Sequence, residues 1–265
     1  APGVRSLRRF LAAVHHVNLS QAAGARVLRD VISDPVVGTT HYLSPIEPTG
    51  KTAFHHRAVQ NADALVNRLF IEPNLGLGYP TQGTRFLRGI DRFQRDGDEE
   101  ALLVDWDFLG VQYYTRLKAY VLPIPGLWTA PIFGHDWRRF DITSTGWEVR
   151  PEGLYEVLAR AHGYGFPRLV VTENGAAYPD ELIDNRVRDK RRIAFYEAHL
   201  EQVLRARDAG IPVDGYFCWS LIDNFEWAEG YRARFGIVYV DYPTQRRIVK
   251  DSGKWFRQLL TGTNG

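Results

Sequence analysis

The sequence is poor in the features that mark several classes of protein. It contains one cysteine, Cys218, so no disulfide can form within the chain, and we expect a packed core thiol in a reducing, cytoplasmic setting. No apolar run approaches the ~20 residues that a helix needs to span a bilayer, so we expect no membrane partner. Ala1-Pro2-Gly3 leads directly into a basic helical pattern, which argues against a signal peptide.

A large net charge and a metal-binding pattern are also missing. The chain has 33 Lys and Arg against 31 Asp and Glu, with a formal net charge of +2, so no nucleic-acid partner is expected. The histidine pairs at 15–16 and 55–56 are adjacent, and adjacent residues on a helix face different directions, so no metal site is expected. We interpret the short run Asp189-Lys190-Arg191-Arg192 as a solvated helix face.

Methionine is absent even at position 1, which is typical of an excised, processed or designed chain. Aromatic residues, in contrast, are abundant, with 7 Trp, 13 Tyr and 14 Phe. Indole and phenyl rings offer large flat apolar surfaces, and sugar rings also present flat apolar faces. The composition is therefore compatible with a flat ligand such as a sugar.

Apolar periodicity predicts that helices and strands alternate along the chain. Helices are predicted over 5–30, 52–71, 151–163, 186–209 and 251–260, and strands over 36–43, 105–115, 168–172 and 213–222. A loop rich in Pro, Gly and Trp is predicted from about 116 to 150. This alternation argues for a parallel sheet with right-handed crossovers, in a single α/β domain over residues 1–265.

One stretch places a carboxylate at a strand end. In "RLVVTENGAAY", residues 168–178, a buried strand is predicted to run up to Glu173, and Asn174-Gly175 is interpreted as a turn that closes it. Catalytic groups of α/β folds lie at the carboxyl ends of strands. The alternative is that Glu173 is an exposed loop residue beside a turn.

The last predicted strand is followed by a second concentration of polar and aromatic side chains. In "YFCWSLIDNFEWAEGYRARFGIVYVDY", residues 216–242, Trp219 ends the strand, and Glu226 and Trp227 follow after a short loop. Carboxylates accept paired hydrogen bonds from neighbouring hydroxyls, and indoles stack on sugar faces. A buried Trp alone is usually a core residue, but the combination favours a sugar site.

These motifs carry a family resemblance. "TENG" at 172–175 and the stretch 216–242 are similar to the family 1 glycoside hydrolases, the β-glucosidase and β-galactosidase group. "VGTTHYLSPIEP" at 37–48 resembles that family's strand five, "DFLGVQYYT" at 107–115 its strand six, and "AVHHVNLSQAAGARVLRD" at 13–30 the helix before strand five. The resemblance covers nearly the whole chain.

The resemblance implies a fold and an activity. The family is a (β/α)8 TIM-type barrel that hydrolyses terminal β-D-glucosides or galactosides with retention and without a cofactor. This chain would supply the C-terminal half, strands five to eight, without the first four strands. The substrate would be a β-glycoside.

It also implies roles for individual residues. Glu173 would be the nucleophile, and Tyr114 would donate a hydrogen bond to its carboxylate. Gln112 stands where the family has asparagine, and it would bind the substrate. Trp219 would form the floor of the sugar subsite, Glu226 and Trp227 would bind hydroxyls, and Phe235 would line the same pocket.

A second carboxylate is not evident. The family's acid/base belongs to an Asn-Glu-Pro motif at the end of strand four, and the sequence lacks this motif. Ile46-Glu47-Pro48 is similar, but it lies in the strand-five match, and Glu47 is interpreted as a loop residue without an acid/base role. We therefore expect an inactive or very weak isolated chain, with its strand edges covered by a complementary N-terminal half barrel or by self-association. The alternative is an inactive barrel fragment or a sugar-binding scaffold.

Overall fold

The structure is a computed structural model, and it describes residue 3 and residues 5–82, 84–122, 130–133 and 141–262. Residues 1–2, and the segments 123–129 and 134–140 of the predicted loop, lie outside the described residues. The chain forms two compact units. The first comprises Ala1–Gly110, Leu117–Ile132 and Gly165–Arg168, and the second comprises Val111–Arg116, Phe133–Tyr164 and Leu169–Gly265.

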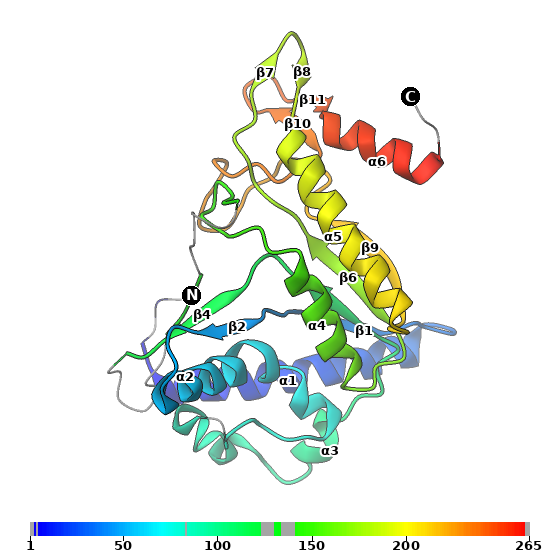
Figure 1. The fold of residues 1–265 in the computed structure, drawn as a ribbon. Coiled ribbons are helices and arrows are strands. Elements are labelled where there is room, and N and C mark those ends of the chain that lie inside the picture. Colours follow the sequence, from blue (N-terminus) through cyan, green and yellow to red (C-terminus); the bar gives the residue numbers. More distant parts are fainter. Residues whose placement is uncertain (1–2, 4, 83, 123–129, 134–140, 263–265) are drawn as a thin grey trace. The chain divides into compact units, whose positions relative to one another are not determined.

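The first unit is mainly helical. Its elements are α1 (Leu7–Val31), β1 (Gly38–Tyr42), β2 (Ile46–Pro48), α2 (Ala53–Asp63), a π-helical turn (Ala64–Arg68), α3 (Asp98–Leu102) and β4 (Leu117–Tyr120), with 3-10 turns at Glu72–Leu75, Arg85–Leu87 and Ile90–Phe93 (Figure 1). Ser6 caps α1, because its hydroxyl accepts a hydrogen bond from the amide of Arg9 at 3.4 Å. Leu11 and Val14 on α1 pack against Leu69, Leu87 and Ile90 in the core of this unit.

One small sheet was not predicted, and it corrects the interpretation of Glu47. Strands β2, β4 and β5 (Ala130–Phe133) form a three-stranded sheet, in which β2 runs parallel to β4 and Glu47 lies opposite Lys118. Glu47 is therefore a strand residue, and its interpretation as a loop residue was wrong. The segment is only three residues long and contains a proline, so it lacks the alternation that identifies a strand.

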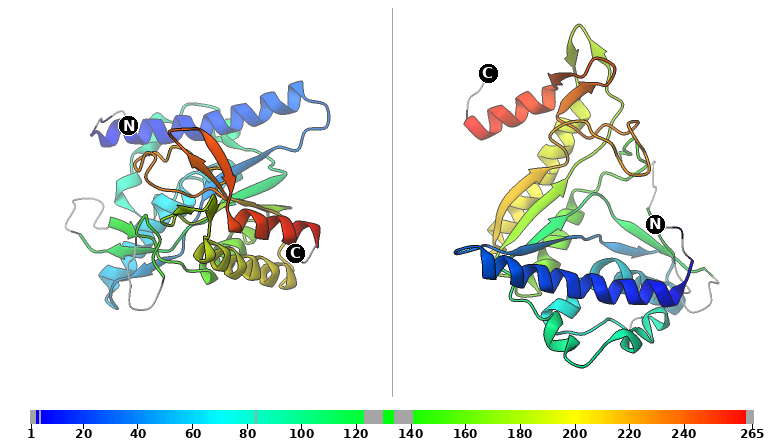
Figure 2. Two further views of the ribbon diagram at one scale, coloured as in Figure 1. Left: turned by 90° about the horizontal axis from the view of Figure 1, so that it is seen from above. Right: turned by 180° about the vertical axis from the view of Figure 1, so that it is seen from behind.

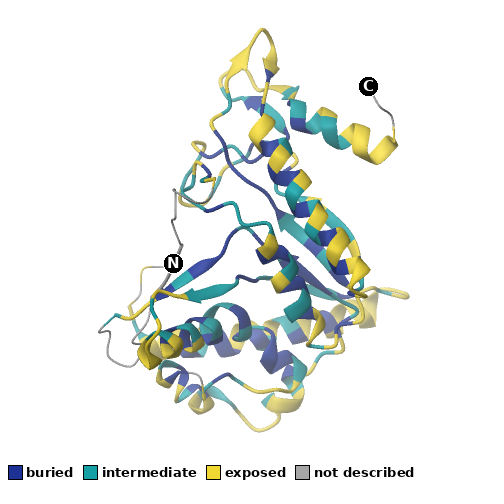
Figure 3. Cartoon of the chain, in the orientation of Figure 1, coloured by how far each residue is buried: buried dark blue, intermediate teal, exposed yellow. Residues whose placement is uncertain are grey.

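The second unit contains the strand that carries Glu173 and the last predicted strand. It holds α4 (Glu152–His162), β6 (Leu169–Asn174), α5 (Lys190–Asp208), β9 (Val213–Cys218) and α6 (Asp251–Thr261), together with the antiparallel pairs β7–β8 (Leu182–Ile183 and Arg186–Val187) and β10–β11 (Val238–Asp241 and Arg246–Val249). α5 lies beside α4 and α6 (Figures 1 and 2). Figure 3 shows buried residues along one side of α5 and exposed residues along the other.

The predicted strands all belong to one four-stranded sheet with the order β1-β3-β6-β9. In β3 (Phe108–Gln112), the residues up to Gly110 belong to the first unit, and Val111 and Gln112 belong to the second. β6 and β9 are parallel, with Leu169 opposite Val213 and Asn174 opposite Cys218. Burial raises the pKa of the Cys218 thiol. The order follows the chain, as expected for successive strand–helix–strand crossovers.

The predicted Asn-Gly turn does not exist. β6 continues through Asn174, whose side chain donates to the Tyr113 carbonyl at 2.7 Å and accepts from the Tyr216 hydroxyl at 2.6 Å. A Cβ atom on Gly175 would lie 1.7 Å from the carbonyl oxygen of Trp219. The glycine is therefore required by the close approach of two backbones and not by a turn.

The start of the long helix and its basic run also differ from the prediction. Residues 186–187 pair in a hairpin, because Asp184 and Asn185 adopt positive φ angles of 49° and 59°, and α5 begins only at Lys190. Arg192 is buried, so the interpretation of the whole run as a solvated face was wrong. Buried carboxylates pair with this guanidinium, and local charge counting cannot reveal them.

Candidate active site

The carboxylate of Glu173 is held from both sides. Gln112 donates from Nε2 to Oε1 at 2.9 Å, and the Tyr114 hydroxyl donates to Oε2 at 2.7 Å. The alternation of side chains along an extended backbone explains why both donors face Glu173, since residues 112 and 114 point to one side. Tyr113 points elsewhere and donates its hydroxyl to the Arg150 carbonyl at 2.5 Å. Its amide donates to the Glu173 carbonyl at 2.9 Å, which fixes the register.

Aromatic rings hold Tyr114 in place. The centroid of the Tyr114 ring lies 5.3 Å from that of Trp147 and 6.2 Å from that of Phe235, in edge-to-face arrangements. The rings of Trp147 and Phe235 are 6.0 Å apart. Trp147 was not predicted as a site residue, because it lies in the predicted loop, which has no periodicity. The only signal for it in the sequence was the tryptophan itself beside the turn residue Gly146.

The protonation state of Tyr114 suits a hydrogen-bond donor. Burial, the hydrogen bond to Glu173 and the negative charge of that carboxylate raise the pKa of the Tyr114 hydroxyl far above its ordinary value. The phenol therefore keeps its proton at every physiological pH. Its hydrogen bond to the carboxylate holds Oε2 of Glu173 in a fixed position.

A second carboxylate, Glu226, lies on the loop after β9. The indole Nε1 of Trp219 donates to its Oε1 at 3.2 Å, and the Asn224 side-chain amide donates to the same atom at 3.1 Å. The Ser220 hydroxyl donates to Asn224 Oδ1 at 3.0 Å, which orients that amide. Burial raises the pKa of Glu226, although its two donors act in the opposite direction. The Trp219 amide donates to the Asn174 carbonyl at 2.8 Å and ties this loop to the end of β6.

The two remaining predicted residues have opposite environments. Phe235 is 2% exposed and packs in a cluster with Ala177, Ala233 and the rings around Tyr114. The side chain of Trp227 is 94% exposed. The structure thus brings Gln112, Tyr114 and Glu173 into direct contact, joins Trp219 to Glu226, and leaves Trp227 on the surface.

The described residues contain no group of three or more His, Cys, Asp or Glu side chains that could hold a metal ion. Among the helices of the described residues, none is long and apolar enough to cross a membrane.

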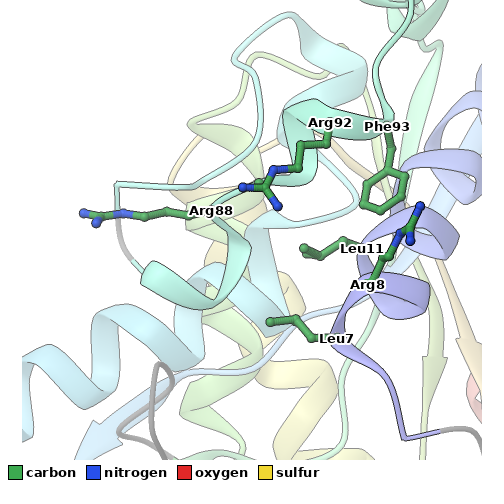
Figure 4. Close-up of a pocket in the computed structure, with 7 residues that line it drawn as sticks. Leu7, Arg8, Leu11, Arg88, Arg92 and Phe93 are labelled. Atoms are coloured by element: carbon green, nitrogen blue, oxygen red, sulfur yellow. The ribbon is translucent and has the colours of Figure 1, made fainter.

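A pocket of about 420 Å³ lies within the first unit (Figure 4). Leu7, Arg8 and Leu11 of α1 line it, together with Arg88, Gly89, Arg92 and Phe93. Phe93 and Leu11 give it an apolar wall, and Arg88 extends away from the other labelled side chains. No carboxylate is among its lining residues, so this pocket does not offer the acid and base groups of a glycosidase.

Residues 1–265 match the protein-family model described as "Glycosyl hydrolase family 1". The chain belongs to glycosyl hydrolase family 1. Curated relatives of this family 1 chain include Beta-glucosidase A of Thermotoga maritima, 38% identical over 264 residues, and Thermostable beta-glucosidase B of Thermobispora bispora, 40% identical over 266 residues. The alignments cover 98% of this chain but only 58% and 54% of those relatives.

Solved structures agree with this assignment. The AHE enzyme from Alicyclobacillus herbarius has a TM-score of 0.90 at 35% identity, and the psychrophilic β-glucosidase BglU from Micrococcus antarcticus has a TM-score of 0.90 at 34% identity. Both comparisons cover 100% of the family 1 chain, and they cover 59% and 61% of the solved chains. The predicted fold, part of a (β/α)8 barrel, is therefore confirmed.

Proposed function

We propose that this family 1 chain carries the nucleophile side of a retaining β-glycosidase that hydrolyses terminal β-D-glucosides or galactosides. The observation that supports this most directly is the carboxylate of Glu173, which receives one hydrogen bond on each oxygen from Gln112 and Tyr114. A nucleophilic carboxylate must be aimed at the reacting carbon, and two fixed donors hold both of its oxygens in place. Each carboxylate oxygen retains a further lone pair that is available for the attack.

The proposed chemistry has two steps. In the first, an oxygen of Glu173 forms a bond to the anomeric carbon, the glycosidic carbon–oxygen bond breaks, and the leaving oxygen takes the electron pair. In the second, water attacks the same carbon and loses a proton to solvent or to a base, the bond to Glu173 breaks and frees the carboxylate, and the sugar keeps its β configuration. Tyr114 remains protonated throughout, because its raised pKa excludes a role as a base.

The loop after β9 is proposed to hold the sugar. No described residue donates a hydrogen bond to Oε2 of Glu226, so this atom is available to sugar hydroxyls, whereas Trp219 and Asn224 hold Oε1. The exposed indole of Trp227 would stack on or border the sugar. Phe235 is buried against Tyr114, and we assign it a supporting role behind the nucleophile instead of direct substrate contact.

The acid/base carboxylate is proposed to come from outside these 265 residues. The sequence holds no Asn-Glu-Pro motif, and the chain spans 58% of the length of its Thermotoga maritima relative. A complementary N-terminal segment or a second copy would also cover apolar side chains that are exposed in the structure. Phe217 on the edge strand β9 is 63% exposed, and Phe10, Val17 and Leu28 are exposed along one side of α1.

The first test uses a substrate whose leaving group needs no proton. We expect the full chain to release a stoichiometric burst of dinitrophenolate from 2,4-dinitrophenyl β-glucoside, followed by slow turnover, because no base activates water. Added azide should accelerate turnover and yield β-glucosyl azide. Natural glucosides should react ~100- to 10,000-fold more slowly than they do with a complete acid/base pair.

The matched control is Glu173→Gln, which keeps the shape of the side chain and should show no burst. Saturable binding of the glucoside by the parent chain without any burst would overturn the proposal and indicate a sugar-binding scaffold. A burst that persists in Glu173→Gln would contradict the assignment of the nucleophile.

A further inference from the structure

Arg192 of α5 is fully buried, and every N–H group of its guanidinium has an acceptor. Nε donates to the Ala176 carbonyl at 3.3 Å, and Nη2 donates to the Arg234 carbonyl at 2.8 Å. Nη1 and Nη2 each donate to one oxygen of Asp180 at 3.0 Å, and Nη1 also donates to Asp189 at 2.5 Å. A guanidinium in this saturated state has a single permitted orientation.

The two backbone acceptors belong to the two segments that build the candidate site. Ala176 follows Glu173 on the chain that leaves β6, and Arg234 immediately precedes Phe235. Ala177 and Phe235 lie in the same buried cluster, which also contacts the ring of Tyr114. The guanidinium of Arg192 thus connects the segment of the carboxylate to the segment that supports its hydrogen-bond donor.

The carboxylates around Arg192 are themselves anchored. Asp189 accepts from the Ser252 amide at 2.8 Å and from its hydroxyl at 2.5 Å. Asp180 also accepts from the buried Lys250 ammonium at 2.5 Å, and Lys250 donates to Asp223 at 2.9 Å. Buried charges that are paired in this way hold their partners in fixed places, because leaving one unpaired is costly.

We propose that Arg192 is a positioning residue for the nucleophile: it locks the carbonyls of Ala176 and Arg234 and thereby sets the geometry of the Glu173–Tyr114 pair. This inference rests on the proposed function of Glu173. A lysine at this position would keep the positive charge, but its compact ammonium cannot reproduce the planar fork that reaches both carbonyls and both carboxylates. The role is therefore one of geometry and not only of charge.

The test compares Arg192→Lys with Asp189→Asn in the full chain. The second variant removes a charged partner of Arg192 but leaves both contacts with the backbone carbonyls. Both variants should lower the melting temperature. We expect Arg192→Lys to slow covalent labelling by 2,4-dinitrophenyl 2-deoxy-2-fluoro-β-glucoside at least ~10-fold per folded molecule at saturating reagent, whereas Asp189→Asn should label at the parent rate.

A second readout does not require activity. In chain labelled with 5-fluorotryptophan, the ¹⁹F resonance of Trp147, assigned with Trp147→Phe, should move in Arg192→Lys and stay in place in Asp189→Asn. If the parent chain is not labelled at Glu173, the proposed function is wrong. The ¹⁹F resonance of Trp147 would then be the remaining test of whether Arg192 positions this part of the structure. An unmoved Trp147 resonance, or parent-rate labelling of folded Arg192→Lys, would overturn the inference.

Discussion

The two carboxylates of the candidate active site, Glu173 and Glu226, are held in different ways. Glu173 lies in a strand, and its two oxygens accept separate hydrogen bonds from Gln112 and Tyr114. Glu226 lies on a loop, and its two donors both reach Oε1. A carboxylate with a hydrogen-bond donor on each oxygen is held in one orientation, which suits attack on a carbon atom. A carboxylate whose donors both reach one oxygen can accept hydrogen bonds from sugar hydroxyls with the other. The contrast separates the proposed chemical step from the proposed binding step.

The position of Glu173 in β6 depends on Gly175, which follows the strand. Gly175→Ala would place a Cβ atom 1.7 Å from the Trp219 carbonyl oxygen, which is backbone and cannot move aside cheaply. We expect the free energy of unfolding to fall by about 3 kcal/mol, as measured by denaturant titration. The matched control is Gly215→Ala in β9, where the new Cβ would meet Val170 at an ordinary 3.4 Å. Equal stability of the two variants would contradict the close backbone approach.

The hydrogen bond of Tyr114 can be removed without removing its ring. Tyr114→Phe should slow the labelling of Glu173 by about 10- to 100-fold, the value of a hydrogen bond to a charged group. Tyr178→Phe is the control, because it removes a tyrosine hydroxyl that donates to Asp141 at 3.1 Å instead of to Glu173. If both variants label at the parent rate, the hydroxyl of Tyr114 has no part in activating the nucleophile.

Glu226→Gln tests the binding side of the contrast. The substitution keeps the contacts to Oε1 in shape but removes the charge and one acceptor, so we expect glucoside binding to weaken by about 10-fold. The rate of labelling at saturating reagent should change less than binding does. Glu229→Gln on the same loop, which loses only a surface ion pair with Arg232, should bind as the parent does.

The raised pKa of Glu226 should also cause a small dependence of stability on pH. Burial penalises the charged form, so the folded chain keeps this proton over a pH range in which the unfolded chain has lost it. This contribution to stability is present at low pH and disappears as the pH rises through the raised pKa. The melting temperature of the parent should therefore fall relative to that of Glu226→Gln as the pH rises above the ordinary pKa of a glutamate side chain. If the melting temperature of the parent instead rose relative to that of Glu226→Gln over this pH range, the assigned direction of the Glu226 pKa shift would be wrong.

The sequence predicted much of the sheet and of the site, for identifiable reasons. β6 and β9 contain apolar residues in the pattern of a strand, so both strands could be predicted. Glu173 lies near the carboxyl end of β6, which made it a candidate catalytic residue. Trp219 and Glu226 were selected as candidates because polar and aromatic residues are dense in one loop, and Tyr114 and Gln112 were selected from the family resemblance.

The missed features depend on contacts between distant segments. Arg192 has the local pattern of a solvated helix face, and only the carboxylates of Asp180 and Asp189 around it explain its burial. Gly175 has the pattern of a turn, but the nearby Trp219 backbone determines its role. Local sequence carries no information on which segment will approach from elsewhere in the chain.

The most direct test of the account identifies the atom that the sugar joins. The full chain would be incubated with 2,4-dinitrophenyl 2-deoxy-2-fluoro-β-glucoside, digested, and analysed by peptide mass spectrometry. We predict one fluoroglucosyl group per chain, on Glu173, and none in Glu173→Gln. A label on another residue, or an unlabelled chain that still binds glucoside, would contradict the proposal that Glu173 is the nucleophile.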